Sequence, residues 1–80
     1  MRVKYEFDIH IYSVQEKNIP FVVEMYNMVY TLKIRTYFKK ATRWYFTVEA
    51  EFPIQLSPEE VNMMKMDTIF RIGYFIKCME

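Results

Sequence analysis

The segment 29–54 constrains the fold most, because apolar and polar side chains alternate along most of its length. The even positions are mostly apolar: Tyr30, Leu32, Ile34, Phe38, Trp44, Phe46, Val48, Ala50, Phe52 and Ile54. The odd positions between them are mostly polar and include Thr31, Lys33, Arg35, Lys39, Arg43, Thr47, Glu49 and Glu51. Successive side chains of a strand point to opposite faces of its sheet, so this pattern predicts strands with one buried and one solvated face.

A turn at residues 40–42 would fold this segment into a β-hairpin whose two faces both match. The cross-strand pairs would be Phe38 with Trp44, Ile34 with Val48, and Lys33 with Glu49. Apolar residues then face apolar residues and opposite charges face each other, which stabilises neighbouring strands. Because a shift by one residue would move every side chain to the other face, the pattern predicts the register as well as the hairpin.

Residues 2–14 alternate in the same way and predict the first strand. One face carries Val3, Tyr5, Phe7, Ile9 and Ile11, and the other carries Arg2, Lys4, Glu6, Asp8, His10 and Tyr12. The polar residues 15–18 interrupt this alternation and predict a loop.

The segment 19–28 has two interpretations. Asn18 could cap a short helix with Pro20 in its first turn, where the fixed φ of proline is tolerated. The β-branched and aromatic run 21–23 favours a strand instead. We favour the helix, because an extended segment here would merge with the hairpin into one unusually long strand.

Pro53 predicts the end of the hairpin, since proline cannot donate a hydrogen bond to a central strand. Ser57 then has the features of a helix N-cap, with Pro58 at the first helical position and Glu60 completing a capping box. This motif predicts a helix over 57–67. Residues 68–78 alternate and are rich in aromatic and β-branched side chains, so we expect a strand there. The alternative is that the helix continues to Met79.

The expected order is strand, helix, strand, strand, helix, strand within a single domain, residues 1–80. With right-handed crossovers this is the ferredoxin-like βαββαβ fold, an α+β class with a four-stranded antiparallel sheet and two helices on one face. In that topology the first strand lies between the third and fourth strands. Arg2 and Lys4 would then lie beside Glu49 and Glu51.

The composition excludes several classes of protein. The formal net charge is +1, so any contact with a polyanion needs a local patch. Cys78 is the sole cysteine, which excludes a disulfide framework and a cysteine metal site. No apolar run approaches the roughly 20 residues that span a bilayer, and early acidic residues do not resemble a signal peptide. We therefore expect a cytoplasmic protein with no membrane contact, metal or cofactor.

The open face of the predicted sheet should gather aromatic and basic side chains at one end. The candidate residues for binding RNA or a protein partner are Tyr12, Arg35, Tyr37, Lys39, Lys40, Arg43, Tyr45 and Arg71, with His10 beside them. Aromatic faces that stack on bases, flanked by cations, are typical of single-strand RNA binding. Residues 43–48 resemble the third-strand motif of RNA-recognition domains, although Trp44 stands where that motif has glycine. The alternative is that the tyrosines stabilise the sheet as cross-strand partners.

Glu6, Asp8 and His10 share one face of the first strand and could ligate a divalent metal or act as acid and base. An aspartate on the first strand resembles the small CRISPR adaptation nuclease and its toxin relatives, which would imply a metal-dependent ribonuclease. In that family the acid ends an apolar strand, whereas Asp8 lies within one. The simpler interpretation is a solvated polar face, and we expect no enzyme.

The helix 57–67 carries more apolar residues than one face can bury. Met63 and Met66 cannot both face the sheet together with Val61 and Met64, so we expect an exposed apolar flank, which is typical of a domain with a partner. In composition the chain resembles small accessory proteins of T-even-type phages. That resemblance implies a non-enzymatic inhibitor that binds a host toxin, nuclease or CRISPR component. A second copy of the chain is another candidate partner.

Overall fold

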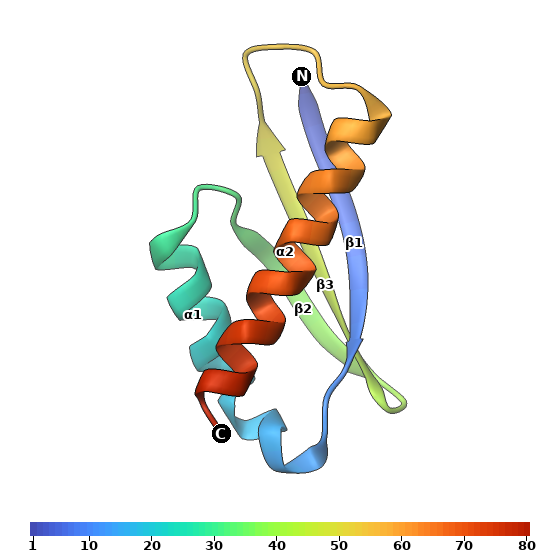
Figure 1. The fold of residues 1–80 in the computed structure, drawn as a ribbon. Coiled ribbons are helices and arrows are strands. Elements are labelled where there is room, and N and C mark those ends of the chain that lie inside the picture. The colour runs from blue at the N-terminus through green and yellow to red at the C-terminus, as the bar shows by residue number, and fades with distance from the viewer.

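The computed structural model describes residues 1–80 and contains a three-stranded sheet and two α-helices (Figure 1). The elements are β1 (Arg2–His10), the 3-10 helix η1 (Ser13–Asn18), α1 (Ile19–Val29), β2 (Ile34–Lys40), β3 (Arg43–Glu51) and α2 (Pro58–Cys78). All strand pairs are antiparallel and the strand order is β1-β3-β2. Both α-helices lie on the same side of the sheet, here called the helix-covered face; the opposite side is the open face. Neither α-helix is long and apolar enough to cross a membrane.

The α+β class and the order of the first five elements agree with the prediction, but the ferredoxin-like sheet of four strands is wrong. Residues 68–78 continue α2 instead of forming a fourth strand, so β1 lies at an edge of the sheet. The reason is visible in the burial of Thr68, Ile72 and Ile76, which repeat every fourth residue and face the core. Once the capping box has nucleated the helix, each further residue adds a hydrogen bond at little extra cost, so α2 continues.

The start of α2 is as predicted. The Ser57 hydroxyl accepts a hydrogen bond from the Glu60 backbone N–H at 3.2 Å, and the Glu60 side chain accepts one from the Ser57 N–H at 3.0 Å. The Ser57 backbone N–H, and to a smaller extent the Ser57 hydroxyl, lower the pKa of the Glu60 carboxyl below its ordinary value because they stabilise its charged form. The helix over 19–28 is confirmed as α1, with Pro20 in its first turn, although the Asn18 side chain makes no capping hydrogen bond.

The hairpin is confirmed, but its register is only partly as predicted. Ile34 lies opposite Val48, and an irregularity between Ile34 and Thr36 then inserts one extra residue into β2. Phe38 therefore lies opposite Tyr45, not opposite Trp44. The turn shortens to residues 41–42, with Ala41 at a φ of 56°, a conformation that favours glycine.

The N-terminal strand is shorter than the predicted 2–14, because the chain turns into η1 after His10. β1 pairs with β3 over its whole length, with Arg2 opposite Glu51 and Lys4 opposite Glu49. The expected charge complementarity at this end is confirmed by an ion pair between Arg2 and Glu49. The predicted Lys33–Glu49 pair is wrong, since Lys33 precedes β2 and donates to the Asn27 carbonyl at 2.5 Å.

The core lies between the helix-covered face and the two α-helices. Across the sheet, Phe7 stacks on Phe46 at 5.4 Å between ring centroids, and Phe46 stacks on Tyr37 at 6.3 Å. The core is completed by buried side chains from the three strands, both α-helices and two connecting segments: Val3, Tyr5, Ile11, Ile19, Val22, Val23, Tyr26, Ile34, Val48, Leu56, Ile72 and Ile76.

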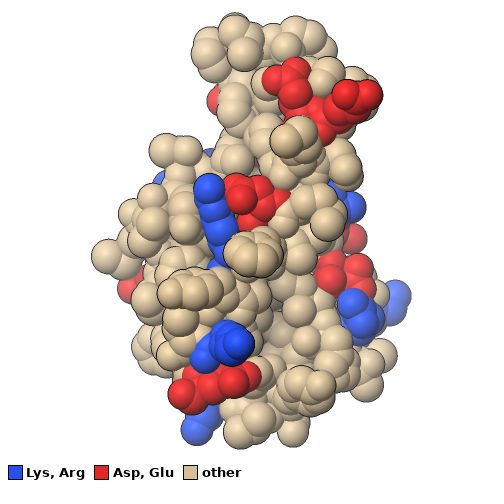
Figure 2. Space-filling view, in the orientation of Figure 1, with Lys and Arg blue, Asp and Glu red and all other residues tan.

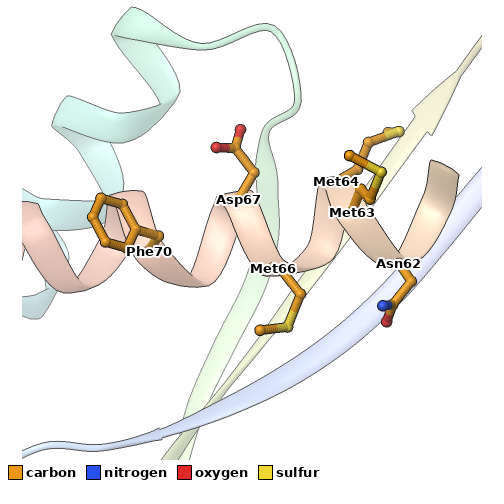
Figure 3. A pocket seen from close by; sticks show the side chains of 6 residues that line it. All are labelled: Asn62, Met63, Met64, Met66, Asp67 and Phe70. Carbon is orange, nitrogen blue, oxygen red and sulfur yellow. The ribbon is translucent and has the colours of Figure 1, made fainter. Parts of the chain in front are cut away.

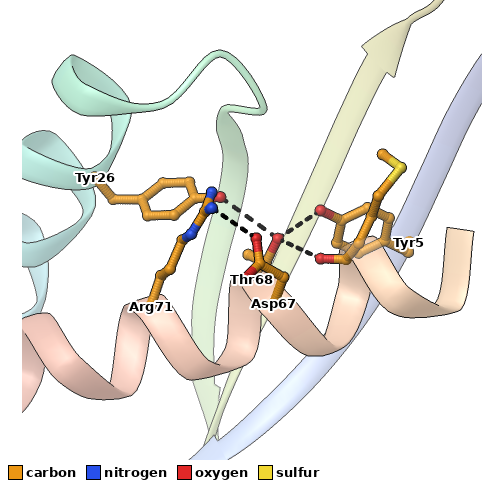
Figure 4. A network of polar contacts seen from close by, with 6 residues as sticks. Tyr5, Tyr26, Asp67, Thr68 and Arg71 are labelled. Atoms are coloured by element: carbon orange, nitrogen blue, oxygen red, sulfur yellow. Dashed lines mark hydrogen bonds and ion pairs between the residues drawn. The ribbon is translucent and has the colours of Figure 1, made fainter. Parts of the chain in front are cut away.

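One buried polar residue joins three elements of this core (Figure 4). The Thr68 hydroxyl of α2 donates to the Met64 carbonyl at 2.9 Å. It accepts from the Tyr26 hydroxyl of α1 at 3.4 Å and lies 2.7 Å from the Tyr5 hydroxyl of β1. The Thr68 hydroxyl has one proton, which it donates to the Met64 carbonyl. Tyr5 is therefore the donor in the hydrogen bond between Tyr5 and Thr68. Burial raises the pKa of both tyrosines, which keeps them protonated as donors.

Candidate binding surfaces

The predicted site at the end of the open face is only partly assembled. Lys40, Arg43 and Tyr45 lie together there, because Lys40 pairs with Arg43 and residues opposite each other on adjacent strands share a face. Phe38, which was not predicted, joins them and stacks on Tyr45 with 5.3 Å between ring centroids. The hairpin end therefore presents one aromatic pair and two cations.

The extra residue in β2 moves two predicted residues to the other face. Tyr37 and Lys39 lie opposite Phe46 and Trp44 on the helix-covered face. Tyr37 stacks on Trp44 at 6.2 Å between ring centroids, so it flanks the core although its side chain stays partly in water. The prediction of these two residues at the open face is wrong, because alternation read from the sequence does not reveal a bulge.

The other three predicted residues are dispersed. Arg35 lies at the bulge, where its Nε donates to the Glu49 carbonyl at 3.4 Å. Tyr12 follows the end of β1 and contacts the His10 ring edge-on at 5.0 Å. Arg71 is on α2, not on a fourth strand, and its guanidinium lies 4.2 Å from the centre of the Tyr30 ring. No common surface at the open face holds all eight predicted residues.

Ion pairs reduce the positive charge near the hairpin end. Arg43 pairs with Asp8 across β1 and β3, and Lys39 pairs with Glu16 of η1 at 2.7 Å. Arg71 pairs with Asp67 at 2.9 Å along α2. Lys40 makes no ion pair, so the cationic character of the hairpin end depends largely on this one side chain.

The acidic residues of β1 contact neighbouring side chains and are not gathered into a metal site. Asp8 accepts a hydrogen bond from Arg43, and Glu6 lies opposite Thr47. No group of three or more His, Cys, Asp or Glu side chains in the chain could hold a metal ion.

One exposed apolar feature is on the outer side of α2, away from the sheet. Four of its side chains form what we call the α2 stripe: Met63, Met66, Phe70 and Tyr74, which are 71%, 57%, 78% and 62% exposed. Figure 3 shows the first three along α2 beside a shallow hollow, with the strands passing behind the helix. The flank expected from Met63 and Met66 is thus confirmed, and it is longer than predicted.

A second set of exposed apolar residues lies on α1. This α1 stripe consists of Phe21, Met25, Met28 and Val29, and Met28 is 80% exposed. In the space-filling view of the helical side, uncharged surface predominates and the charged side chains are few and scattered (Figure 2). Most monomers expose large apolar residues singly, whereas here eight occur on two adjacent helices.

The sequence contains a signal for both stripes, which alternation obscures only in α2. In α1, positions 21, 25, 28 and 29 are apolar although positions 19, 22, 23 and 26 already fill the core-facing side. In α2, the alternation of residues 68–78 predicts a strand, in which Phe70 and Tyr74 would share one face with Ile72 and Ile76. A helix with more apolar residues than one side can bury predicts an exposed surface.

Comparison with protein-family models, with curated proteins and with solved structures found no match to this chain.

Proposed function

We propose that this protein is a non-enzymatic binding protein, which uses the outer surface of its two α-helices to cover part of a protein partner. The observation that supports the proposal is the pair of exposed stripes, eight large apolar side chains in a domain of 80 residues. Their exposure to water is unfavourable in the isolated chain and is relieved when a partner covers them.

The residue types of these stripes favour a protein as the partner. Five of the eight side chains are methionine or valine, and the other three are aromatic. Methionine adapts its shape to an apolar partner surface, and aromatic residues supply much of the affinity at protein interfaces. Phosphate recognition needs cations instead. Of the cations of α2, Arg71 is paired with Asp67, and Lys77 lies at one end of the stripe, beside Phe70 and Tyr74.

The compositional resemblance to small accessory proteins of T-even-type phages favours a host protein as the partner. On this proposal the chain inhibits a host toxin, nuclease or CRISPR component in the cytoplasm by occupying its surface. Inhibition by occlusion needs apolar contact area and no reacting groups, so it agrees with a surface rich in methionine and aromatic side chains.

The test compares substitutions on the two sides of the molecule. Tagged wild type, the double variant Phe21→Glu/Met28→Glu and the open-face control Thr36→Glu are used to capture proteins from host lysate, with and without ribonuclease. We expect wild type and Thr36→Glu to retain one partner at similar amounts, and the double variant to retain at least about tenfold less. Capture that is unaffected by the two glutamates on the α1 stripe would refute the proposal.

RNA binding is a second candidate, because Phe38 and Tyr45 stack on the open face beside Lys40 and Arg43. Removing one stacking aromatic typically costs about 1–3 kcal/mol of binding free energy. Fluorescence anisotropy with a single-stranded RNA, at two salt concentrations, would compare wild type with Tyr45→Ala and Lys40→Ala. Weak and salt-insensitive signals from all three proteins would exclude this candidate.

A further inference from the structure

The exposed side of α2 carries a regular seam that is longer than the apolar stripe. Six residues, here called the α2 seam, follow each other at spacings of four, three, four, three and four: Glu59, Met63, Met66, Phe70, Gly73 and Lys77. All six are exposed, and they lie opposite the buried Thr68, Ile72 and Ile76. Alternating spacings of three and four residues place side chains in the line along which two helices pack as a coiled coil.

Gly73 has no intramolecular reason to be glycine. It is the sole glycine of the chain, lies inside α2, and has no positive φ. A Cβ atom at this position would meet nothing within 4 Å. Glycine is among the least favourable residues in a helix interior, so its presence here is costly without a compensating contact. The close approach of another backbone or a large side chain from outside would supply that contact.

We propose that the α2 seam pairs with the α2 seam of a second copy of this chain, in an antiparallel, two-fold symmetric arrangement. The spacings read the same in both directions, so reversing one helix superposes seam positions on seam positions. Met66 then lies opposite Phe70 of the partner subunit, and Met63 lies opposite Gly73 of the partner subunit. The large Met63 side chain fills the space that glycine leaves.

The charges at the ends of the seam favour the antiparallel orientation. Glu59 lies in the first turn of α2 and Lys77 in the last turn, and neither makes an ion pair within the chain. Antiparallel pairing places Glu59 opposite Lys77 of the partner subunit at both ends of the interface. Parallel pairing would instead place like charges opposite each other, which is unfavourable. The helix dipoles of antiparallel helices also oppose each other favourably.

This inference rests on the proposed function, since it assigns a partner to one part of the same helical surface. The seam extends about 27 Å along α2 at a rise of 1.5 Å per residue, enough for five turns of contact. Pairing through α2 leaves the α1 stripe of each subunit for the host protein. The dimer would then carry two copies of the host-binding surface, which strengthens binding to an oligomeric target.

Sedimentation equilibrium of the purified full-length chain tests the proposal. We expect wild type to form a dimer with a dissociation constant of about 1–100 µM. Phe70→Glu should weaken the dimer by about 30-fold or more. The matched control Met28→Glu, an equally exposed apolar residue outside the seam, should leave dimerisation unchanged. A wild type that is monomeric at about 1 mM, or equal effects of the two substitutions, would overturn the proposal.

Two further variants test the geometry. Gly73→Leu should weaken the dimer by about tenfold, because the new side chain occupies the space of Met63 from the partner subunit. It should not lower the thermal stability of the monomer, since leucine favours the helix more than glycine does. Glu59→Lys and Lys77→Glu should each weaken the dimer several-fold, and their combination should restore it. A double variant as weak as the single variants would exclude the antiparallel register.

The two proposals fail separately. If dimerisation is absent but Phe21→Glu/Met28→Glu still abolishes capture of a host protein, the proposed function stands and the self-pairing is wrong. In the opposite outcome, the dimer forms and is weakened by the seam variants, while the α1-stripe variant captures as much host protein as wild type does. In that case the self-pairing stands and the proposal that the α1 stripe binds a host protein is wrong.

Discussion

The inner and outer sides of α2 are made of similar side chains, but only one side is covered. Ile72 and Ile76 on the inner side are buried against the sheet, whereas Phe70 and Tyr74 on the outer side are mostly in water. Burying a large apolar side chain contributes about 1.5–3 kcal/mol, so the inner side stabilises the monomer and the outer side does not. The outer side is therefore available to a partner at no cost to the fold.

The apolar residues on both sides of α2 also explain why this helix resembles a strand in the sequence. Residues 70, 72, 74 and 76 are all apolar, and a period of two is typical of a strand. In a helix, residues two apart lie on nearly opposite sides, so apolar surfaces on both sides of one helix produce the same period. The misleading alternation and the exposed stripe have a single cause.

The largest expected effect is a difference in stability between substitutions on the inner and the outer side of α2. Ile72→Ala, at a fully buried position, should lower the free energy of unfolding by about 2–5 kcal/mol, because it leaves a cavity in the core. Phe70→Ala should change it by less than about 0.5 kcal/mol in the monomer. Urea unfolding at low protein concentration measures both. Similar losses for the two variants would show that Phe70 is packed in the monomer and would remove the basis of the comparison.

Much of the fold follows from local signals. The capping box at Ser57, the alternation of β1 and β3, and the Ile34–Val48 pair were all predictable, because each depends on neighbouring residues or on one cross-strand match. The bulge at Arg35 was not, because the adjacent polar residues Arg35 and Thr36 interrupt the alternation without showing how β2 then pairs with β3. That single extra residue places Tyr37 and Lys39 on the helix-covered face, and it is the main reason why the predicted open-face site is incomplete.

A smaller effect is expected from the polar group on the inner side. Thr68→Val keeps the shape of the side chain but removes the hydroxyl that Tyr5 and Tyr26 contact. Two buried donors then lose their acceptor, and the free energy of unfolding should fall by about 1–3 kcal/mol. Thr68→Ser, which keeps the hydroxyl, is the matched control and should lose less. Equal losses in urea unfolding would show that the methyl group, and not the hydrogen bonds, is what matters.

The same tyrosines predict how stability depends on alkaline pH. Burial raises the pKa of Tyr5 and Tyr26 in the folded state above the ordinary value of 10.0. Below pH 10 the two tyrosines are protonated in both the folded and the unfolded state, so their contribution to the free energy of unfolding is fully present. Above pH 10 the unfolded chain releases protons first, so stability falls as the pH rises towards the folded pKa values. Thermal unfolding at a series of pH values should show this fall, and Tyr5→Phe/Tyr26→Phe should flatten it. A fall of the same steepness in the double variant would assign it to other groups.

The smallest effect concerns the start of α2, which supports both sides of the helix at once. Ser57→Ala removes the acceptor for the Glu60 N–H and should lower the free energy of unfolding by about 1 kcal/mol. Ser57→Asp restores an acceptor and should keep nearly full stability, which urea unfolding can check.

Fraying of the first turn would also displace Glu59 and Met63, the first two positions of the α2 seam. If the seam pairs two copies of the chain, Ser57→Ala therefore weakens the dimer as well as the monomer, whereas Ile72→Ala acts first on folding. A capping variant that destabilises the monomer but leaves sedimentation unchanged would place the contact between copies nearer the middle of α2, around Met66 and Phe70.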